Sequence, residues 1–85
     1  MKAKKITHGD GFTVIIDLND NVWTFGSNTD GQLGQRNTKH SETPRMIKNL
    51  KVKKISTGYK HVVAIDLQDN VWTWGMELMA AIRIS

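Results

Sequence analysis

The sequence predicts an all-β fold built from a repeated antiparallel β-hairpin, and three observations support this prediction. Residues 4–26 recur at 53–75 with a constant offset of 49 residues and no gap, and 14 of the 23 aligned positions are identical. Each copy contains a short β-branched or apolar run, at 13–16 and 62–65, that is long enough for a strand and too short for a helix. Each run leads through an Asp- and Asn-rich turn into a second short strand with two aromatic residues on one face. A duplicated strand–turn–strand unit is therefore the building block of this chain.

The two turns and the strands that follow them have nearly the same sequence in both copies. The turn is Asp-Leu-Asn-Asp-Asn at 17–21 and Asp-Leu-Gln-Asp-Asn at 66–70, and the next strand is Val-Trp-Thr-Phe-Gly at 22–26 and Val-Trp-Thr-Trp-Gly at 71–75. Because the first strand of each copy is apolar on both faces, we expect neighbouring sheets to cover each sheet on both sides. Four aspartates recur with the repeat, which predicts turn and strand-end roles instead of an acid–base pair: Asp17, Asp20, Asp66 and Asp69.

A glycine-rich segment at 26–34 separates the first hairpin from the strand that returns. Its three glycines and one asparagine predict a tightly folded loop, and we expect Leu33 to anchor this loop in the core. Pro44 is placed where an edge strand would begin. The alternation of lysine and apolar residues at 51–55 predicts a half-exposed strand.

The motifs of both copies resemble the regulator of chromosome condensation repeat family. The second copy carries Gly-Tyr-Lys-His-Val-Val-Ala-Ile at 58–65, and the first carries the loop Asn-Thr-Asp-Gly-Gln-Leu-Gly at 28–34 after its Val-Trp-Thr-Phe-Gly strand. The resemblance covers residues 4–75, and it implies four-stranded blades arranged around a central channel, usually about seven of them. The expected fold is therefore an incomplete β-propeller of about one and a half blades.

The expected organisation is a first repeat at 1–52, a partial second repeat at 53–75 and a tail at 76–85 outside the family pattern. The tail has no Gly-Gln-Leu-Gly loop, as a truncated or frame-shifted reading frame would leave it, and its composition favours a short C-terminal helix. An amphipathic cap is the alternative interpretation, although an isolated helix of this length is marginal in water. Stacked repeats generally need about three units for stability, so we expect a chain that is marginally folded, aggregating or self-associated through open β edges.

No group of residues in the sequence is typical of catalysis, metal binding or cofactor binding, and we expect that the protein is not an enzyme. The chain contains no cysteine, and its three histidines occupy unrelated positions in the two copies, so no metal-ligand spacing emerges. The loop at 28–34 lacks the Lys-Ser/Thr pair that completes a phosphate-binding loop, and no nucleophile motif is present. We therefore expect no bound metal and no cofactor.

The expected function is that of a non-catalytic protein–protein interaction module, or a remnant of a larger propeller, acting through the polar loop at 27–41. The alternative that the resemblance implies is part of a guanine-nucleotide exchange factor for a small GTPase, or a chromatin-associated adaptor. In the exchange factors, loops on one propeller face press on the GTPase and help expel its nucleotide. Because such a site draws on many blades, we do not expect exchange activity from this chain alone. The candidate partner-binding residues are Asn28, Asp30, Arg36, Lys39 and His61.

His61 has two interpretations. It belongs to the Gly-x-x-His element at 58–61, which the first copy replaces by Gly-Asp-Gly-Phe at 9–12. The resemblance implies that this histidine forms local hydrogen bonds within the blade. The alternative is a contact with a partner on the propeller face.

The charge distribution narrows the class of partner. The formal net charge is +4, and residues 27–52 contribute +3 of it, which favours an acidic partner surface or a solvated basic loop. Lysines along an edge strand also guard against unwanted sheet pairing. Because Trp23, Trp72 and Trp74 lie in the repeated hairpin motif, we expect them to pack between blades, and we do not expect nucleic acid as a partner.

Hydropathy bears on the cellular location. No apolar run approaches the roughly 18 residues that span a bilayer. The basic residues at 2–5 are not followed by the apolar core of a signal peptide. We therefore expect a soluble protein of the cytoplasm or nucleus that does not enter the membrane.

Overall fold

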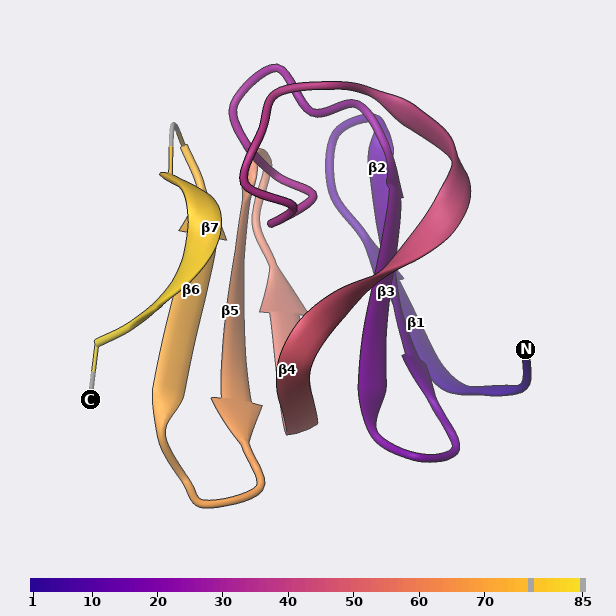
Figure 1. The fold of residues 1–85 in the computed structure, drawn as a ribbon, viewed down its shortest axis with the longest axis vertical. Coiled ribbons are helices and arrows are strands. Elements are labelled where there is room, and N and C mark those ends of the chain that lie inside the picture. The colour runs from indigo at the N-terminus through magenta and orange to yellow at the C-terminus, as the bar shows by residue number, and fades with distance from the viewer. Residues whose placement is uncertain (77, 85) are drawn as a thin grey trace.

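The computed structural model describes residues 1–76 and 78–84, which form seven β-strands (Figure 1). Neighbouring strands are antiparallel throughout, and they follow one another in chain order. This arrangement confirms the predicted all-β class. The strands are β1 (Ala3–His8), β2 (Phe12–Asp17), β3 (Asn21–Gly26), β4 (Ser41–Thr57), β5 (His61–Asp66), β6 (Val71–Gly75) and β7 (Leu78–Arg83).

The long strand β4 joins two four-stranded sheets. Its first part pairs with β3, where Thr24 faces Arg45, and its last part pairs with β5, where Ile55 faces Ala64. The change of sheet falls between Lys51, which still pairs with Asn21 of β3, and Val52, which pairs with Asp66 of β5. Shortly before it Asn49 has a φ of 59°, in the left-handed region. Figure 1 shows β4 passing between the group β1–β3 and the group β5–β7. The last strand of the first sheet therefore continues as the first strand of the second sheet, as expected for adjacent propeller blades.

The two sheets use the same register, displaced by the repeat length. Thr7 pairs with Val14 between β1 and β2, and Ser56 pairs with Val63 between β4 and β5. The first strands of the two sheets meet at one point, where the hydroxyl oxygens of Thr7 and Thr57 lie 2.8 Å apart. The predicted hairpins are thus confirmed in both copies.

The hydrophobic core lies between the two sheets. The first sheet contributes Phe12, Val14 and Ile16 from β2, and the second contributes Val62 and Ala64 from β5; all five are almost fully buried. Because side chains alternate along a strand, each sheet buries one face against the other. Stacking of one sheet on the next is therefore what holds this chain together.

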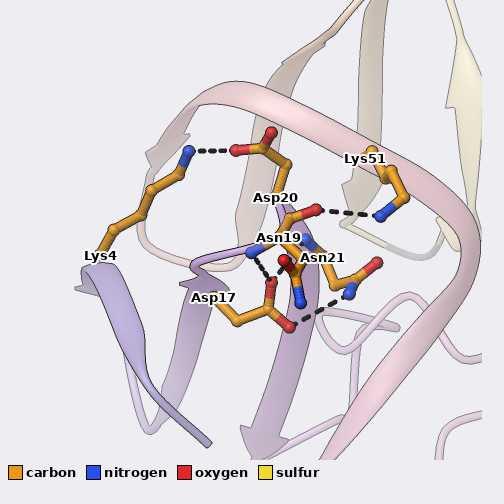
Figure 2. Close-up of polar contacts among 6 residues, drawn as sticks. All are labelled: Lys4, Asp17, Asn19, Asp20, Asn21 and Lys51. Carbon is orange, nitrogen blue, oxygen red and sulfur yellow. Dashed lines mark hydrogen bonds and ion pairs between the residues drawn. The ribbon is translucent and has the colours of Figure 1, made fainter.

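The turn between β2 and β3 is organised by a single carboxylate. Asp17 Oδ1 accepts hydrogen bonds from the backbone N–H groups of Asn19 and Asn21, at 2.8 and 2.9 Å, and Figure 2 shows these residues around it. Asp17 Oδ2 accepts hydrogen bonds from Asn21 Nδ2 at 3.2 Å and from the Trp23 indole Nε1 at 2.9 Å. The predicted turn role of Asp17 is confirmed, and the carboxylate also orients the tryptophan of the following strand.

The second copy repeats this arrangement around Asp66. Its carboxylate accepts hydrogen bonds from the backbone N–H groups of Gln68 and Asn70, from the Asn70 side chain and from the Trp72 indole Nε1 at 2.8 Å. The shared hydrogen-bond pattern explains why both turns have the Asp-Leu-x-Asp-Asn sequence. Each repeat therefore carries its own Asp–Trp clasp, a name used below for these two hydrogen-bonded sets.

Lysines attach the first turn to its neighbours. Lys4 of β1 pairs with Asp20, and Lys51 Nζ donates a hydrogen bond to the backbone oxygen of Asn19 at 2.9 Å (Figure 2). The Lys4–Asp20 pair recurs in the second copy as Lys53–Asp69. Because these pairs are exposed, each contributes little, about 0–1 kcal/mol, to stability.

Acid is expected to destabilise the fold between about pH 4 and pH 2 through the two Asp–Trp clasps. The Trp23 indole, helped by Asn21, outweighs desolvation and lowers the pKa of Asp17 from 3.8 to about 2, and Trp72 likewise lowers the pKa of Asp66. Because the folded state has the lower pKa, the unfolded state binds more protons in this range, so stability falls as the pH falls.

Urea denaturation followed by circular dichroism at pH 7, 4, 3 and 2 measures this effect. The double variant Asp17→Asn/Asp66→Asn should be less stable at pH 7 and lose less stability between pH 4 and pH 2 than the wild type. Asp10→Asn, an exposed carboxylate at the other end of the sheets, serves as the control and should keep the wild-type dependence. A double variant with the wild-type slope would show that the clasps do not control the acid response.

The C-terminal tail forms a strand, and the predicted short helix is wrong. Within the described part of the tail, β7 pairs with β6, where Thr73 faces Ile82 and Trp72 faces Arg83. These pairs occupy the place that the first part of β4 takes on β3, and Ala81 packs against the core. The open edge of β6 offers unpaired backbone groups, whereas a helix of this length would have to stand alone. The second sheet consequently has four strands, more than the predicted hairpin; Glu77 and Ser85 lie outside the described residues.

Candidate functional site

One end of the two sheets carries the long loop between β3 and β4 together with three short turns, and it is the candidate site. The turn after β1, the loop between β3 and β4, the turn after β4 and the turn after β6 all lie at this end, which is the upper end in Figure 1. Neighbouring connections are linked by backbone hydrogen bonds, including Asp10 N–H to Tyr59 O at 2.8 Å and Met76 N–H to Lys60 O at 3.0 Å. The opposite end has only the two short turns of the Asp–Trp clasps. We call the end with the long loop the loop rim.

Asn28 holds the loop between β3 and β4 in shape. Its side chain is fully buried, and Oδ1 accepts a hydrogen bond from the Leu33 N–H at 3.0 Å. Its Nδ2 donates to the backbone oxygens of Asn37 and Lys39, each at 2.9 Å. Asn28 was predicted to contact a partner, but burial and these hydrogen bonds leave its side chain no accessible surface. Its role in the structure is to fix the loop.

The same loop is attached to the second sheet through Trp74 and Gln32. Trp74 is fully buried, and its Nε1 donates a hydrogen bond to the Gln32 backbone oxygen at 2.8 Å. The buried Gln32 side chain in turn accepts a hydrogen bond from the Asp30 N–H at 2.8 Å. Leu33 is buried beside them, and its carbonyl accepts a hydrogen bond from Thr24 Oγ1 at 2.7 Å. The predictions that Leu33 anchors the loop and that Trp74 packs between the sheets are confirmed.

Two of the predicted site residues, Asp30 and His61, line one shallow hollow of about 500 Å³ on the loop rim. The hollow is completed by Tyr59, Lys60 and Met76. Tyr59 is 70% exposed and Met76 is 65% exposed. Lys60 Nζ lies 3.4 Å from Asp30 Oδ2 and 5.9 Å from the centre of the Tyr59 ring, so it links the charged and the aromatic sides of the hollow. We call these five residues the rim hollow.

His61 also has a packing role at the start of β5. The Gly58 N–H donates a hydrogen bond to the His61 backbone oxygen at 2.9 Å, and a Cβ at Gly58 would collide with the imidazole ring. In the first copy Phe12 takes the same position against Gly9. The ring therefore combines local packing within the blade with a place on the rim hollow.

The remaining predicted residues lie elsewhere. Arg36 is exposed and lines a groove of about 800 Å³, together with Arg45, Lys48, Trp23 and Trp72. We call it the basic groove. Lys39 is exposed and lines a separate depression beside His40 and Ser41. The structure thus distributes the five predicted residues over one buried position and three different surfaces.

Sequence reasoning missed Tyr59, Lys60 and Met76 as members of the site. A signal for the first two existed, because Tyr-Lys replaces Asp-Gly of the first copy in an otherwise similar turn. Residues that differ between repeats are free to serve a purpose that the repeat itself does not need. Met76 gave no signal, since it follows the last position that matches the repeat.

Among the residues that the structure describes, no group of three or more histidine, cysteine, aspartate or glutamate side chains is arranged to hold a metal ion. Within the same residues, no helix has the length and apolar character needed to cross a membrane.

Known structures contain the same arrangement of strands. Human WBSCR16 matches 98% of this chain with a TM-score of 0.91 and 13% identity, over 25% of its own length. Prp20p from Saccharomyces cerevisiae, in a study of its binding to Gsp1p and histones, matches 86% of this chain with a TM-score of 0.71 and 18% identity, over 18% of its own length. Yeast RCC1 (Prp20), bound to Kap60, matches with a TM-score of 0.70, 17% identity and the same coverage of both chains. This chain thus spans a quarter or less of the length of these structures.

Comparison by sequence identifies the family. No curated protein matches the chain in a direct sequence search. Two family models of the Regulator of chromosome condensation (RCC1) repeat match it, one over residues 19–65 and the other over residues 3–32. Together these matches contain the first hairpin, the glycine-rich loop and the start of the second hairpin. The chain therefore belongs to the Regulator of chromosome condensation repeat family.

Proposed function

We propose that this chain is a non-catalytic protein-interaction module that binds its partner at the rim hollow. The observation that carries the proposal is the exposure of Tyr59 and Met76 beside the Asp30–Lys60 pair, on a rim that buried residues hold in place. Tyrosine and methionine are enriched at protein interfaces, and charged groups at the edge of such a patch add specificity.

The support beneath the hollow favours binding. Asn28 and Gln32 are buried and hydrogen-bonded, so the loop that carries Asp30 has little conformational freedom to lose when a partner binds. The Met76 N–H is likewise bonded to the backbone of Lys60. Preorganisation of this kind lowers the entropic cost of association.

A small GTPase is the partner class that we favour, and histones are the second candidate. Exchange factors occur among family members, and the structure of Prp20p was studied for its binding to Gsp1p and histones. The net charge of +4 on this chain favours a partner with an acidic surface, whereas histones are themselves basic. Electrostatics therefore counts against the histones, which leaves the GTPase as the favoured partner class.

Biolayer interferometry with nucleotide-free small GTPases, Gsp1p among them, and with purified core histones tests the proposal. The variant Tyr59→Ala/Met76→Ser should weaken partner binding about tenfold or more, because it removes the two exposed apolar anchors of the hollow. The matched control is Leu18→Ser/Leu67→Ser, which removes two leucines that are 58% and 42% exposed in the turns at the opposite end. Equal binding by both variants, or a loss restricted to the leucine variant, would show that the rim hollow is not the binding surface.

A further inference from the structure

The two sheets cover each other on one face only, and they use different faces to do so. In the first sheet the covered face contains every second residue of β2 and β3. In the second sheet the residues equivalent to these lie on the open face, and the covered face contains the residues between them in β5 and β6. We call the face that the first sheet buries the forward face, and the face that the second sheet buries the rear face. On the first sheet the forward face consists of Phe12, Val14, Ile16, Val22 and Thr24, all buried.

The rear face of the second sheet receives this forward face. Its residues are Ile55, Val62, Ala64, Trp72 and Trp74, of which Trp72 is partly buried and the others are buried. One interface between a forward and a rear face is therefore already present in the chain. It shows which two surfaces of this repeat are complementary.

Each sheet also has one face that no described residue of the other sheet covers. The forward face of the second sheet carries His61, Val63, Ile65, Val71 and Thr73, which are only half-buried. The rear face of the first sheet carries Ile6, Thr13, Ile15, Trp23 and Phe25; Ile6 is 62% exposed, and the rest are half-buried.

The open forward face carries nearly the same residues as the covered forward face, and the open rear face keeps part of the covered rear face. Relative to the covered forward face, the open one keeps valine, isoleucine, valine and threonine at equivalent positions and replaces only Phe12 by His61. Relative to the covered rear face, the open one keeps the isoleucine and the first tryptophan, as Ile6 and Trp23. The other three positions change from Val62, Ala64 and Trp74 to Thr13, Ile15 and Phe25. We propose that the open forward face of one copy of this chain binds the open rear face of a second copy, so that copies assemble head to tail.

The interface inside the chain indicates what binds the two open faces. Because the open faces resemble the faces that already pack together, we assign them to a second copy of the chain. Two faces that differ from each other make a heterologous contact, which forms a ring if the rotation closes. Propellers close with about four to eight blades, and each copy supplies two sheets. Since the chain corresponds to 25% of the WBSCR16 chain, we expect a ring of about three or four copies.

Two variants separate the two open faces. Val63→Lys/Ile65→Lys blocks the forward face, and Ile6→Lys/Ile15→Lys blocks the rear face. None of these side chains is fully buried, so the added lysines can reach solvent. Both variants gain the same sign of charge, which excludes attraction between introduced charges. Leu18→Lys/Leu67→Lys, in the exposed turns, is the matched control.

Sedimentation equilibrium at tens of micromolar measures the mass of each species. The wild type and the leucine control should form assemblies of three or four copies. Each face variant alone should be a monomer with the wild-type circular dichroism spectrum. An equimolar mixture of the two face variants should form a dimer and stop there, because it retains one intact forward face and one intact rear face. This rescue also demonstrates that both variants fold.

Several results would overturn the proposal. A wild type that is a monomer at these concentrations would exclude assembly through the open faces. Face variants that assemble like the wild type would place the contact at a strand edge instead. A mixture that remains monomeric, or that grows beyond a dimer, would show that the two faces do not recognise each other.

Discussion

Trp74→Ala is expected to lower the free energy of unfolding by about 3–5 kcal/mol, the largest effect we expect from a single core substitution. Trp74 is fully buried between the sheets, and its indole donates the hydrogen bond to Gln32 that attaches the long loop to the second sheet. Truncation removes the apolar contacts, leaves a cavity and deprives a buried carbonyl of its donor. Because small domains have only about 5–15 kcal/mol of stability in total, this substitution should remove a large share of it.

Trp74→Phe is the matched control, since Phe25 occupies the equivalent position in the first copy. It keeps an aromatic ring and loses the indole N–H, so we expect a smaller loss of about 1–3 kcal/mol. Urea denaturation followed by far-ultraviolet circular dichroism measures both variants. If the alanine variant were as stable as the phenylalanine variant, the indole ring would not be the packing element that we describe.

Gly26→Ala is expected to cost about 3 kcal/mol, because the position requires both an unusual backbone angle and space that a side chain would fill. Gly26 has a φ of 111°. A Cβ there would collide with the backbone oxygen of Gly11 and lie 2.9 Å from Phe12 Cα, and neither backbone atom can move aside cheaply. Gly75 repeats this geometry with a φ of 93°, which explains the glycine that ends both Val-Trp-Thr-x-Gly strands.

Gly11→Ala separates the two causes. Gly11 also has a positive φ, of 74°, but a Cβ there would meet only Ser27 Cβ at the ordinary distance of 3.4 Å. This control should therefore cost only the left-handed backbone penalty of about 1–2 kcal/mol. Thermal unfolding of both variants measures the difference. Equal losses would show that the close approach of the Gly11 carbonyl to Gly26 does not contribute.

The local structure of this chain followed from its sequence because each signal acts between residues that are close together in the chain. The offset of 49 residues between the copies reappears as the offset between the strand pairs of the two sheets. The Asp-Leu-x-Asp-Asn segments form turns, since Asp17 and Asp66 bond the backbone two and four residues ahead. Leu33 was recognisable as an anchor because it is the one large apolar residue in a glycine-rich loop.

The candidate site was less predictable than the fold. Asn28 belongs to the polar loop at 27–41 that is predicted to bind a partner, but its side chain is hydrogen-bonded to three backbone groups of this loop. Asp30 and His61 are 31 positions apart, and only the packing of the loop onto the second sheet brings both to the rim hollow. Tyr59 and Met76 join them through turns that belong to different hairpins.

By itself, the sequence determined the repeat, its two hairpins, their turns and the glycines that end the second strands, because propensity, alternation and turn chemistry act within a few residues. The tertiary structure decided the conformation of the tail, where the unpaired edge of β6 outweighs a weak helix preference and recruits β7. It also decided which face of each sheet is covered. The two copies have nearly the same residues on both faces, and only the position of one sheet relative to the other buries Val14 while leaving its equivalent, Val63, half-exposed.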